Sequence, residues 1–268
     1  MTTFVRICLL FLPALAGSRL VFGQNNRLPG LELAPGDTTA AVFPLVNIYK
    51  SPTANAPQVG QLTQGQIVVV KQKTEVSAGF DGFRQFWYEV AFGRQMKESG
   101  FVFGPGLASG FTRTPDGTCF LLRVIESGNE NADEKQVEIK VADKKGSLVS
   151  FVKQMPVGPE DSLVVYRRDS LNFFGYTNMV VFDFTSIRCP DRHRELGVLW
   201  NGERAMQMPA LDTPDEAKSP CFSYRYVLPD APDGEPGILK IRVQKTATQQ
   251  TWARFRFMKN FGFIEIRN

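Results

Sequence analysis

The sequence predicts an all-β protein in which a small β-barrel is followed by an antiparallel β-sandwich. Apolar residues occur in short runs where β-branched and aromatic side chains alternate with polar ones, as in residues 137–141. This period of two is typical of half-buried strands. Glycine (23 residues) and proline (17 residues) separate the runs, and no stretch shows the 3.6-residue apolar period of an amphipathic helix.

Residues 1–23 have the layout of a secretory signal peptide. A short positive start and an apolar run precede small residues that offer cleavage after Ala16 or after Gly23. A membrane anchor is the alternative, but crossing a bilayer takes about 20 apolar residues and Arg19 interrupts this stretch. We therefore expect export to the periplasm or the cell exterior, a mature chain that does not span the membrane, and a linker over residues 24–39.

Residues 40–108 contain four segments that follow one another in a recognisable order. Residues 47–52 read NIYKSP, residues 59–66 read VGQLTQGQ, residues 87–90 read WYEV and residues 100–102 read GFV. In order and spacing this set resembles the bacterial SH3 (SH3b) domain family. Tyr49 stands at a usual arginine of that pattern, and Phe101 stands at a usual tryptophan.

The resemblance implies an SH3-like barrel that serves as a targeting or recognition module for cell-wall peptides or partner proteins. Trp87, Tyr88 and Phe101 are expected in the barrel core, because large rings contribute much of the buried surface of a small domain. Tyr49, Phe83 and Phe86 are the candidate ligand-binding residues: two of them border a glycine-rich loop, and exposed aromatic side chains favour binding. The alternative is a loop that folds its own aromatic side chains onto the barrel.

Residues 109–118 (SGFTRTPDGT) are rich in turn-forming residues and mark the expected domain boundary. About nine strand-like runs follow in residues 119–268, which predict the sandwich domain of no recognised family. In the run 179–184 (MVVFDF), alternation places Asp183 on the face opposite Phe182 and Phe184. We therefore expect Asp183 to point to solvent, since a buried carboxylate without a partner is costly.

Three cysteines, Cys119, Cys189 and Cys221, follow the signal segment. In an exported protein two of them can pair, and Cys189 with Cys221 is the favoured pair because both flank prolines. Free buried thiols remain the alternative.

Composition excludes several classes of function. The chain has 1 histidine, which removes most histidine-based catalysis and metal binding. Loss of Arg6 and Arg19 with the signal segment lowers the formal charge from +4 to +2, which does not favour nucleic-acid binding. Arg254 and Arg256, with Lys240 and Arg242 on a neighbouring strand, make a modest basic stripe or simply the solvent side of a sheet.

No catalytic motif, metal site or cofactor site is predicted. Cys189 and His193 flank Pro190 at a strand end, which does not favour a nucleophile pair. We therefore expect a non-catalytic binding protein of the bacterial cell envelope. Two alternatives stay open. A hydrolase would gather carboxylates such as Asp183 or Asp191 in a cleft, and a structural subunit would expose an apolar patch or an unpaired edge strand.

Overall fold

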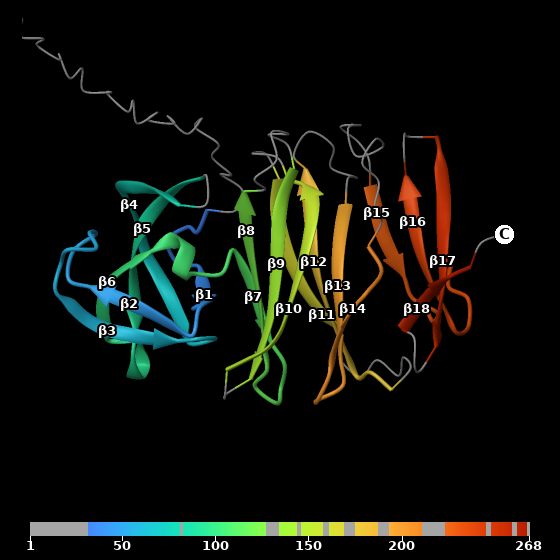
Figure 1. Cartoon of the computed structure of the whole chain (residues 1–268), viewed down its shortest axis with the longest axis horizontal. Coiled ribbons are helices and arrows are strands. Elements are labelled where there is room, and N and C mark those ends of the chain that lie inside the picture. Colours follow the sequence, from blue (N-terminus) through green and yellow to red (C-terminus); the bar gives the residue numbers. More distant parts are fainter. Residues whose placement is uncertain are drawn as a thin grey trace, which may run out of the picture.

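The computed structural model describes residues 32–80, 83–126, 134–143, 146–157, 161–168, 175–186, 193–210, 223–244, 248–258 and 262–266. Within these ranges the chain is almost entirely β, which confirms the predicted fold class (Figure 1). The helical elements described are two short 3-10 turns, Arg94–Met96 and Gly104–Gly106. Cys189 and Cys221, the signal segment and the first part of the expected linker lie outside the described residues.

The first domain is a six-stranded sheet that curls around its own apolar core, with strand order β1-β4-β5-β6-β2-β3. Alternate residues of these strands, including Ile48, Val68 and Val90, fill that core because each strand turns every second side chain inward. The strands are β1 (Thr38–Ala40), β2 (Leu45–Tyr49), β3 (Gln58–Thr63), β4 (Ile67–Phe80), β5 (Phe83–Phe92) and β6 (Glu98–Phe103).

The hairpin of β4 and β5 is longer than the sequence predicts. On either side of residues 81 and 82, the segment expected as a glycine-rich loop is paired strand, with Phe80 opposite Phe83 and Ser77 opposite Phe86. Phe86 therefore belongs to a strand whose even-numbered residues face the core, and it is buried there. The expectation that Phe86 lies on an exposed aromatic surface is wrong for this reason.

The second domain consists of two packed sheets. One sheet has four strands in the order β10-β9-β8-β7, and the other has eight, in the order β11-β12-β13-β15-β16-β17-β18 with β14 paired to β13. The first sheet contains β7 (Gly110–Arg113), β8 (Cys119–Glu126), β9 (Glu134–Asp143) and β10 (Gly146–Pro156). The second contains β11 (Asp161–Arg168), β12 (Asn178–Ser186), β13 (His193–Trp200), β14 (Ala205–Gln207), β15 (Ser223–Val227), β16 (Ile238–Gln244), β17 (Gln250–Met258) and β18 (Gly262–Glu265).

The predicted sandwich is formed by the four-stranded sheet and the β11–β13 part of the eight-stranded sheet. Phe120 and Ile139 from the first meet Phe182, Leu196 and Trp200 from the second in one continuous core. This is the face-to-face packing expected of strands that alternate apolar and polar residues.

The eight-stranded sheet then curls, so that β16–β18 come to cover the other face of β12 and β13. Val181 and Leu199 on that face pack with Leu239 of β16, Phe255 of β17 and Phe263 of β18. At the bend β13 and β15 run parallel and share one registered pair, Arg194 with Tyr224. We call this junction the seam. It departs from the antiparallel pattern expected of the whole sandwich.

The first domain packs directly on the outer face of the four-stranded sheet. Ala40, Val42 and Ala108 on one side meet Leu121 and Ala142 on the other in a shared core of mostly small residues. β7 lies within the segment where the sequence places the domain boundary, and it forms a hairpin with β8. The two domains are therefore joined by packing as well as by the chain.

Candidate functional site

Two groups of side chains stand out as candidate sites, and the first is an aromatic surface on the six-stranded domain. Side chains of β2, β5 and β6 that alternate with core residues point outward, because their neighbours Ile48, Phe86 and Val102 face inward. Together with one residue at the end of β4 they form what we call the aromatic face. Its members are Tyr49, Phe80, Trp87, Phe101 and Phe103.

Four rings of the aromatic face contact one another: Tyr49 meets Trp87 and Phe80 meets Phe103 edge to face, while Trp87 and Phe103 are tilted by 38°. The Trp87 ring centroid lies 5.6 Å from that of Tyr49 and 5.3 Å from that of Phe103. Phe80 contacts Phe103 at 6.1 Å and is 37% exposed. Trp87 is buried as expected, but it is covered by these rings rather than by the barrel core. The result is a rigid aromatic platform on the domain surface.

Uncharged polar side chains border the platform along β2 and β3. The Gln61 amide donates to Asn47 Oδ1 at 3.0 Å, and Asn47 Nδ2 donates to the Tyr49 hydroxyl at 3.3 Å. All three side chains project from the outward side of their strands, and Asn47 and Gln61 are exposed. The platform therefore offers ring faces together with hydrogen-bonding amides.

A small pocket adjoins Phe80 where the first domain meets β8. Its volume is about 40 Å³, and its lining includes Phe80, Gln85, Pro105, Leu107 and Arg123. A pocket for a drug-sized ligand holds about 300 Å³ or more, so this one suits a few water molecules. This pocket is therefore too small to enclose a drug-sized ligand of the aromatic face.

The structure brings together only part of the predicted ligand set. Tyr49 lies in the aromatic face, Phe86 lies in the core, and Phe83 is placed by its backbone at the tip of the β4–β5 hairpin. The described cysteine, Cys119, is buried and has a free thiol. Sequence reasoning missed Phe103 as a surface residue, and it expected Phe101 of the aromatic face in the barrel core. Strict alternation with Val102 is the signal that places Phe103 outward.

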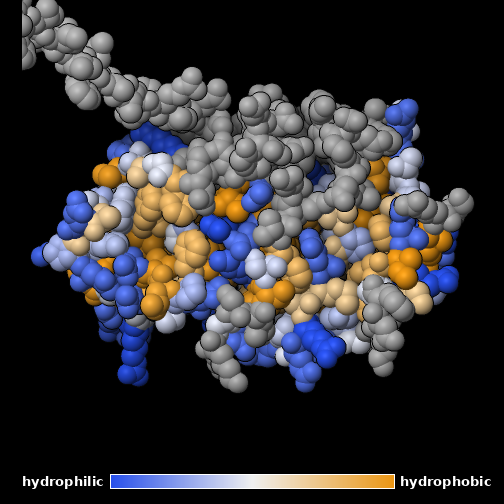
Figure 2. All heavy atoms as spheres, in the orientation of Figure 1, coloured by the Kyte–Doolittle hydropathy of each residue, from blue (hydrophilic) through white to orange (hydrophobic). Residues whose placement is uncertain are grey.

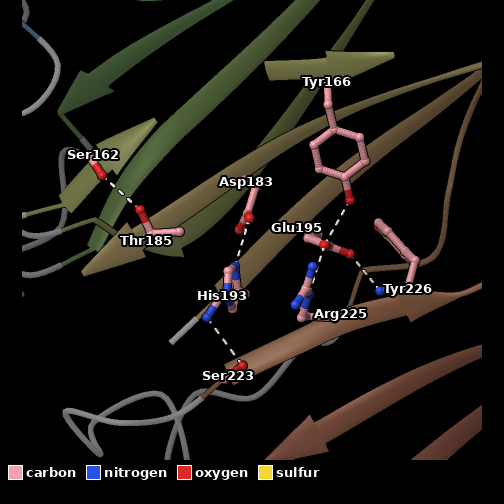
Figure 3. Close-up of polar contacts among 9 residues, drawn as sticks. All are labelled: Ser162, Tyr166, Asp183, Thr185, His193, Glu195, Ser223, Arg225 and Tyr226. Carbon is pink, nitrogen blue, oxygen red and sulfur yellow. Dashed lines mark hydrogen bonds and ion pairs between the residues drawn. The ribbon is translucent and has the colours of Figure 1, made fainter. Parts of the chain in front are cut away.

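The second candidate site is a polar cluster on the concave face of the curled sheet (Figure 3). His193 Nδ1 lies 2.7 Å from Asp183 Oδ2. Asp183 is only 5% exposed, so the expectation that it points to solvent is wrong. Alternation assigned Asp183 to the correct face of β12, opposite Phe182 and Phe184, but the curl of the sheet covers that face as well.

Glu195 is the centre of the same cluster and lies directly opposite Asp183 in the β12–β13 register. Its Oε1 accepts hydrogen bonds from the Tyr166 hydroxyl at 2.8 Å and from Arg225 Nε at 3.2 Å, and its Oε2 accepts one from the Tyr226 amide at 2.6 Å. Burial raises the pKa of Glu195 despite these donors. Burial and the adjacent Glu195 charge likewise raise the pKa of Tyr166.

The cluster resembles only part of a catalytic constellation. Asp183 can orient the His193 ring, but it is the single hydrogen-bond partner of that ring among the described residues. Ser223 Oγ accepts from the His193 backbone amide at 3.2 Å, not from the imidazole. Ser162 and Thr185 bond to each other at 2.7 Å. No described hydroxyl is thus held by the imidazole as a nucleophile.

The described residues contain no group of three His, Cys, Asp or Glu side chains placed to hold a metal ion. In the same part of the chain, no helix has the length and apolar character needed to span a membrane. Comparison of the chain with protein-family models, with curated proteins and with solved structures gives no match.

Proposed function

We propose that the protein is an exported, non-catalytic binding protein of the bacterial cell envelope. In this proposal the first domain is an SH3b-like module that recognises a cell-wall peptide or a partner protein. The observation that carries the proposal is the aromatic face, a rigid set of rings at the surface with hydrogen-bonding amides beside it. Aromatic side chains held in this way provide contact area at low entropic cost, which is typical of recognition sites.

Co-sedimentation of the chain with purified peptidoglycan tests this function. The double variant Tyr49→Ala, Phe103→Ala removes two rings of the aromatic face, and we expect it to bind at least about tenfold more weakly. Val76→Ala removes an exposed apolar side chain that lies outside the face, and we expect wild-type binding. Equal binding by all three proteins would exclude the aromatic face as the site. Absence of wild-type binding would exclude the wall and leave a protein partner.

A second candidate function, an envelope hydrolase, is favoured by the Asp183–His193 pair. An imidazole held by a buried carboxylate is a suitable general base for activating water. In this alternative, wild-type protein releases soluble fragments from peptidoglycan and His193→Ala does not. Binding without release supports the first proposal.

A further inference from the structure

The strand register gathers basic side chains on the side of β16 and β17 that faces away from Leu239 and Ile241, and Arg225 of β15 borders this side at the seam, where it also reaches Glu195 of the polar cluster. Arg225 of β15 lies opposite Arg242 of β16, and Lys240 of β16 lies opposite Arg254 of β17. Arg256 follows two residues further along the same side of β17. The residues of the basic stripe seen in the sequence thus lie side by side in the sheet, and Arg225 adds a fifth basic side chain. We call these five residues, with the apolar side chains among them, the basic face.

This arrangement places like charges directly opposite each other. Like charges directly opposite each other on neighbouring strands destabilise a sheet, and the basic face has two such pairs. Arg225 and Arg254 contact the carboxylates of Glu195 and Glu235. For Lys240, Arg242 and Arg256 the described residues include no ion-pair partner. The positive charge of the face therefore exceeds its negative charge.

Large apolar side chains are exposed on the same face. Trp252 is 40% exposed and lies opposite Arg242, and the Lys240 ammonium lies 4.9 Å from its ring centroid. Ile264 of β18 lies opposite Arg256 and is 43% exposed. Met258, two residues beyond Arg256, is 44% exposed. Figure 2 shows hydrophobic and hydrophilic side chains interleaved at the end of the molecule that β17 and β18 occupy.

We propose that the basic face binds the surface of a bilayer that contains anionic phospholipids. Arginine and lysine pair with lipid phosphates, tryptophan favours the headgroup region, and isoleucine and methionine gain by entering the acyl boundary. A soluble acidic polymer would account for the cations, but it would leave Ile264 and Met258 in water. The outer side of a sheet is also broad enough to meet a bilayer with several side chains at once.

Trp252 fluorescence tests the proposal in the full chain. Trp87 and Trp200 are buried, at 6% and 2% exposed, so a shift of tryptophan emission on adding vesicles reports Trp252. We expect a blue shift with vesicles of phosphatidylglycerol and phosphatidylcholine, and none with phosphatidylcholine alone. Trp252→Phe should abolish the shift. Added salt should weaken it, because the interaction is electrostatic.

A pair of charge-reversal variants localises the contact. Lys240→Glu with Arg256→Glu should weaken binding to anionic vesicles by about fivefold or more per cation. Lys50→Glu with Lys97→Glu makes the same change in net charge on exposed residues of the first domain, and should bind as wild type does. Every variant keeps the same N-terminal apolar segment. A difference in vesicle binding between the two pairs is therefore due to the basic face. Circular dichroism checks that each variant is folded.

Three results would overturn the proposal. The first is no emission shift with anionic vesicles. The second is equal weakening by the two charge-reversal pairs, which would show a general charge effect. The third is binding of soluble polyphosphate that matches or exceeds binding of the vesicles, which would assign the face to an acidic polymer.

Discussion

Glu195 is the residue on which most of the polar cluster depends. It accepts hydrogen bonds from Tyr166, Arg225 and the Tyr226 amide, and it lies opposite the buried carboxylate of Asp183. Two buried carboxylates on adjacent strands repel each other when both are charged. In addition, Asp183 Oδ1 is one of the buried atoms of the described residues that lack a hydrogen-bond partner. The environment of Glu195 therefore favours the protonated form of its carboxyl, whose pKa is raised by burial.

This environment predicts a pH dependence that Glu195→Gln should remove. The folded pKa of Glu195 is raised above its ordinary value of 4.5 by burial. The folded protein then holds the proton more tightly than the unfolded chain does, so the stabilisation is complete below that value and is lost as the pH rises through the raised pKa. Between pH 4 and pH 7, wild-type protein should lose free energy of unfolding relative to Glu195→Gln.

Urea unfolding of both proteins across that pH range measures the difference between their free energies of unfolding. The contributions of the other titrating groups largely cancel in this difference. A wild-type protein that gains stability relative to the variant as the pH rises would show that the donors outweigh burial and that the Glu195 pKa is lowered.

At this scale, the sequence predicts which residues share a face better than it predicts what covers the face. Alternation correctly separates Asp183 from Phe182 and Phe184, and it separates Trp87 from Phe86. It cannot show that the eight-stranded sheet curls over Asp183, or that the β4–β5 hairpin extends past Phe86. Those outcomes depend on contacts between strands that are distant in the chain.

Among the elements, the seam between β13 and β15 is the weakest connection of the eight-stranded sheet. One registered backbone pair joins the two strands, and side chains replace the missing ladder. Ser223 Oγ accepts the His193 amide, Glu195 Oε2 accepts the Tyr226 amide, and the Tyr226 hydroxyl accepts the Gly197 amide. The polar cluster therefore has a structural role whether or not it has a chemical one.

The seam predicts that the two parts of the sheet open independently. Amides of β16 and β17 should exchange with solvent at a lower free energy than amides of β12, because a region held by few contacts opens first. Ser223→Ala should lower the opening free energy of β16 and β17 by about 1 kcal/mol, the typical net contribution of a hydrogen bond. It should leave the opening free energy of β12 unchanged. Native-state hydrogen exchange read by mass spectrometry gives both values.

Exchange of β12, β16 and β17 at one common free energy would instead show that the curled sheet opens as a unit.

Sequence reasoning identifies most of these strands but not the seam, because the parallel contact brings together residues separated by a long connection. The basic stripe on β16 and β17 was predictable, since a hairpin sets its own register.

In the whole molecule, the four-stranded sheet is a middle layer with apolar residues on both sides. Phe120 and Leu122 face the sandwich core, while Cys119 and Leu121 face the first domain. Gly65 in the first domain fits closely against this layer: a Cβ atom there would lie 3.0 Å from Cys119 Sγ, and its φ of +75° suits glycine. The two domains thus meet through close packing.

Because the two domains pack closely, we expect the wild-type protein to unfold in a single transition. Overpacking the shared core should divide this transition into two. Ala142 is buried in the shared core, and Ala142→Leu should destabilise it by about 1–3 kcal/mol. The first domain should then unfold at a lower temperature than the sandwich. Differential scanning calorimetry distinguishes one transition from two, and Ala78→Leu, at an exposed position of β4, is the matched control. A divided transition in the wild-type protein would show that the domains are energetically separate.

The shared core also has a mechanical consequence. The first domain, which carries the aromatic face, and strands β16–β18 lie toward opposite ends of the molecule (Figure 1), and the layers between them are joined by packed side chains rather than by an extensible tether. A force applied to one end is transmitted through the packed sheets to the other end, because no flexible linker has to be extended first. Partners bound at its two ends would therefore be held at a fixed separation by the packed layers between them.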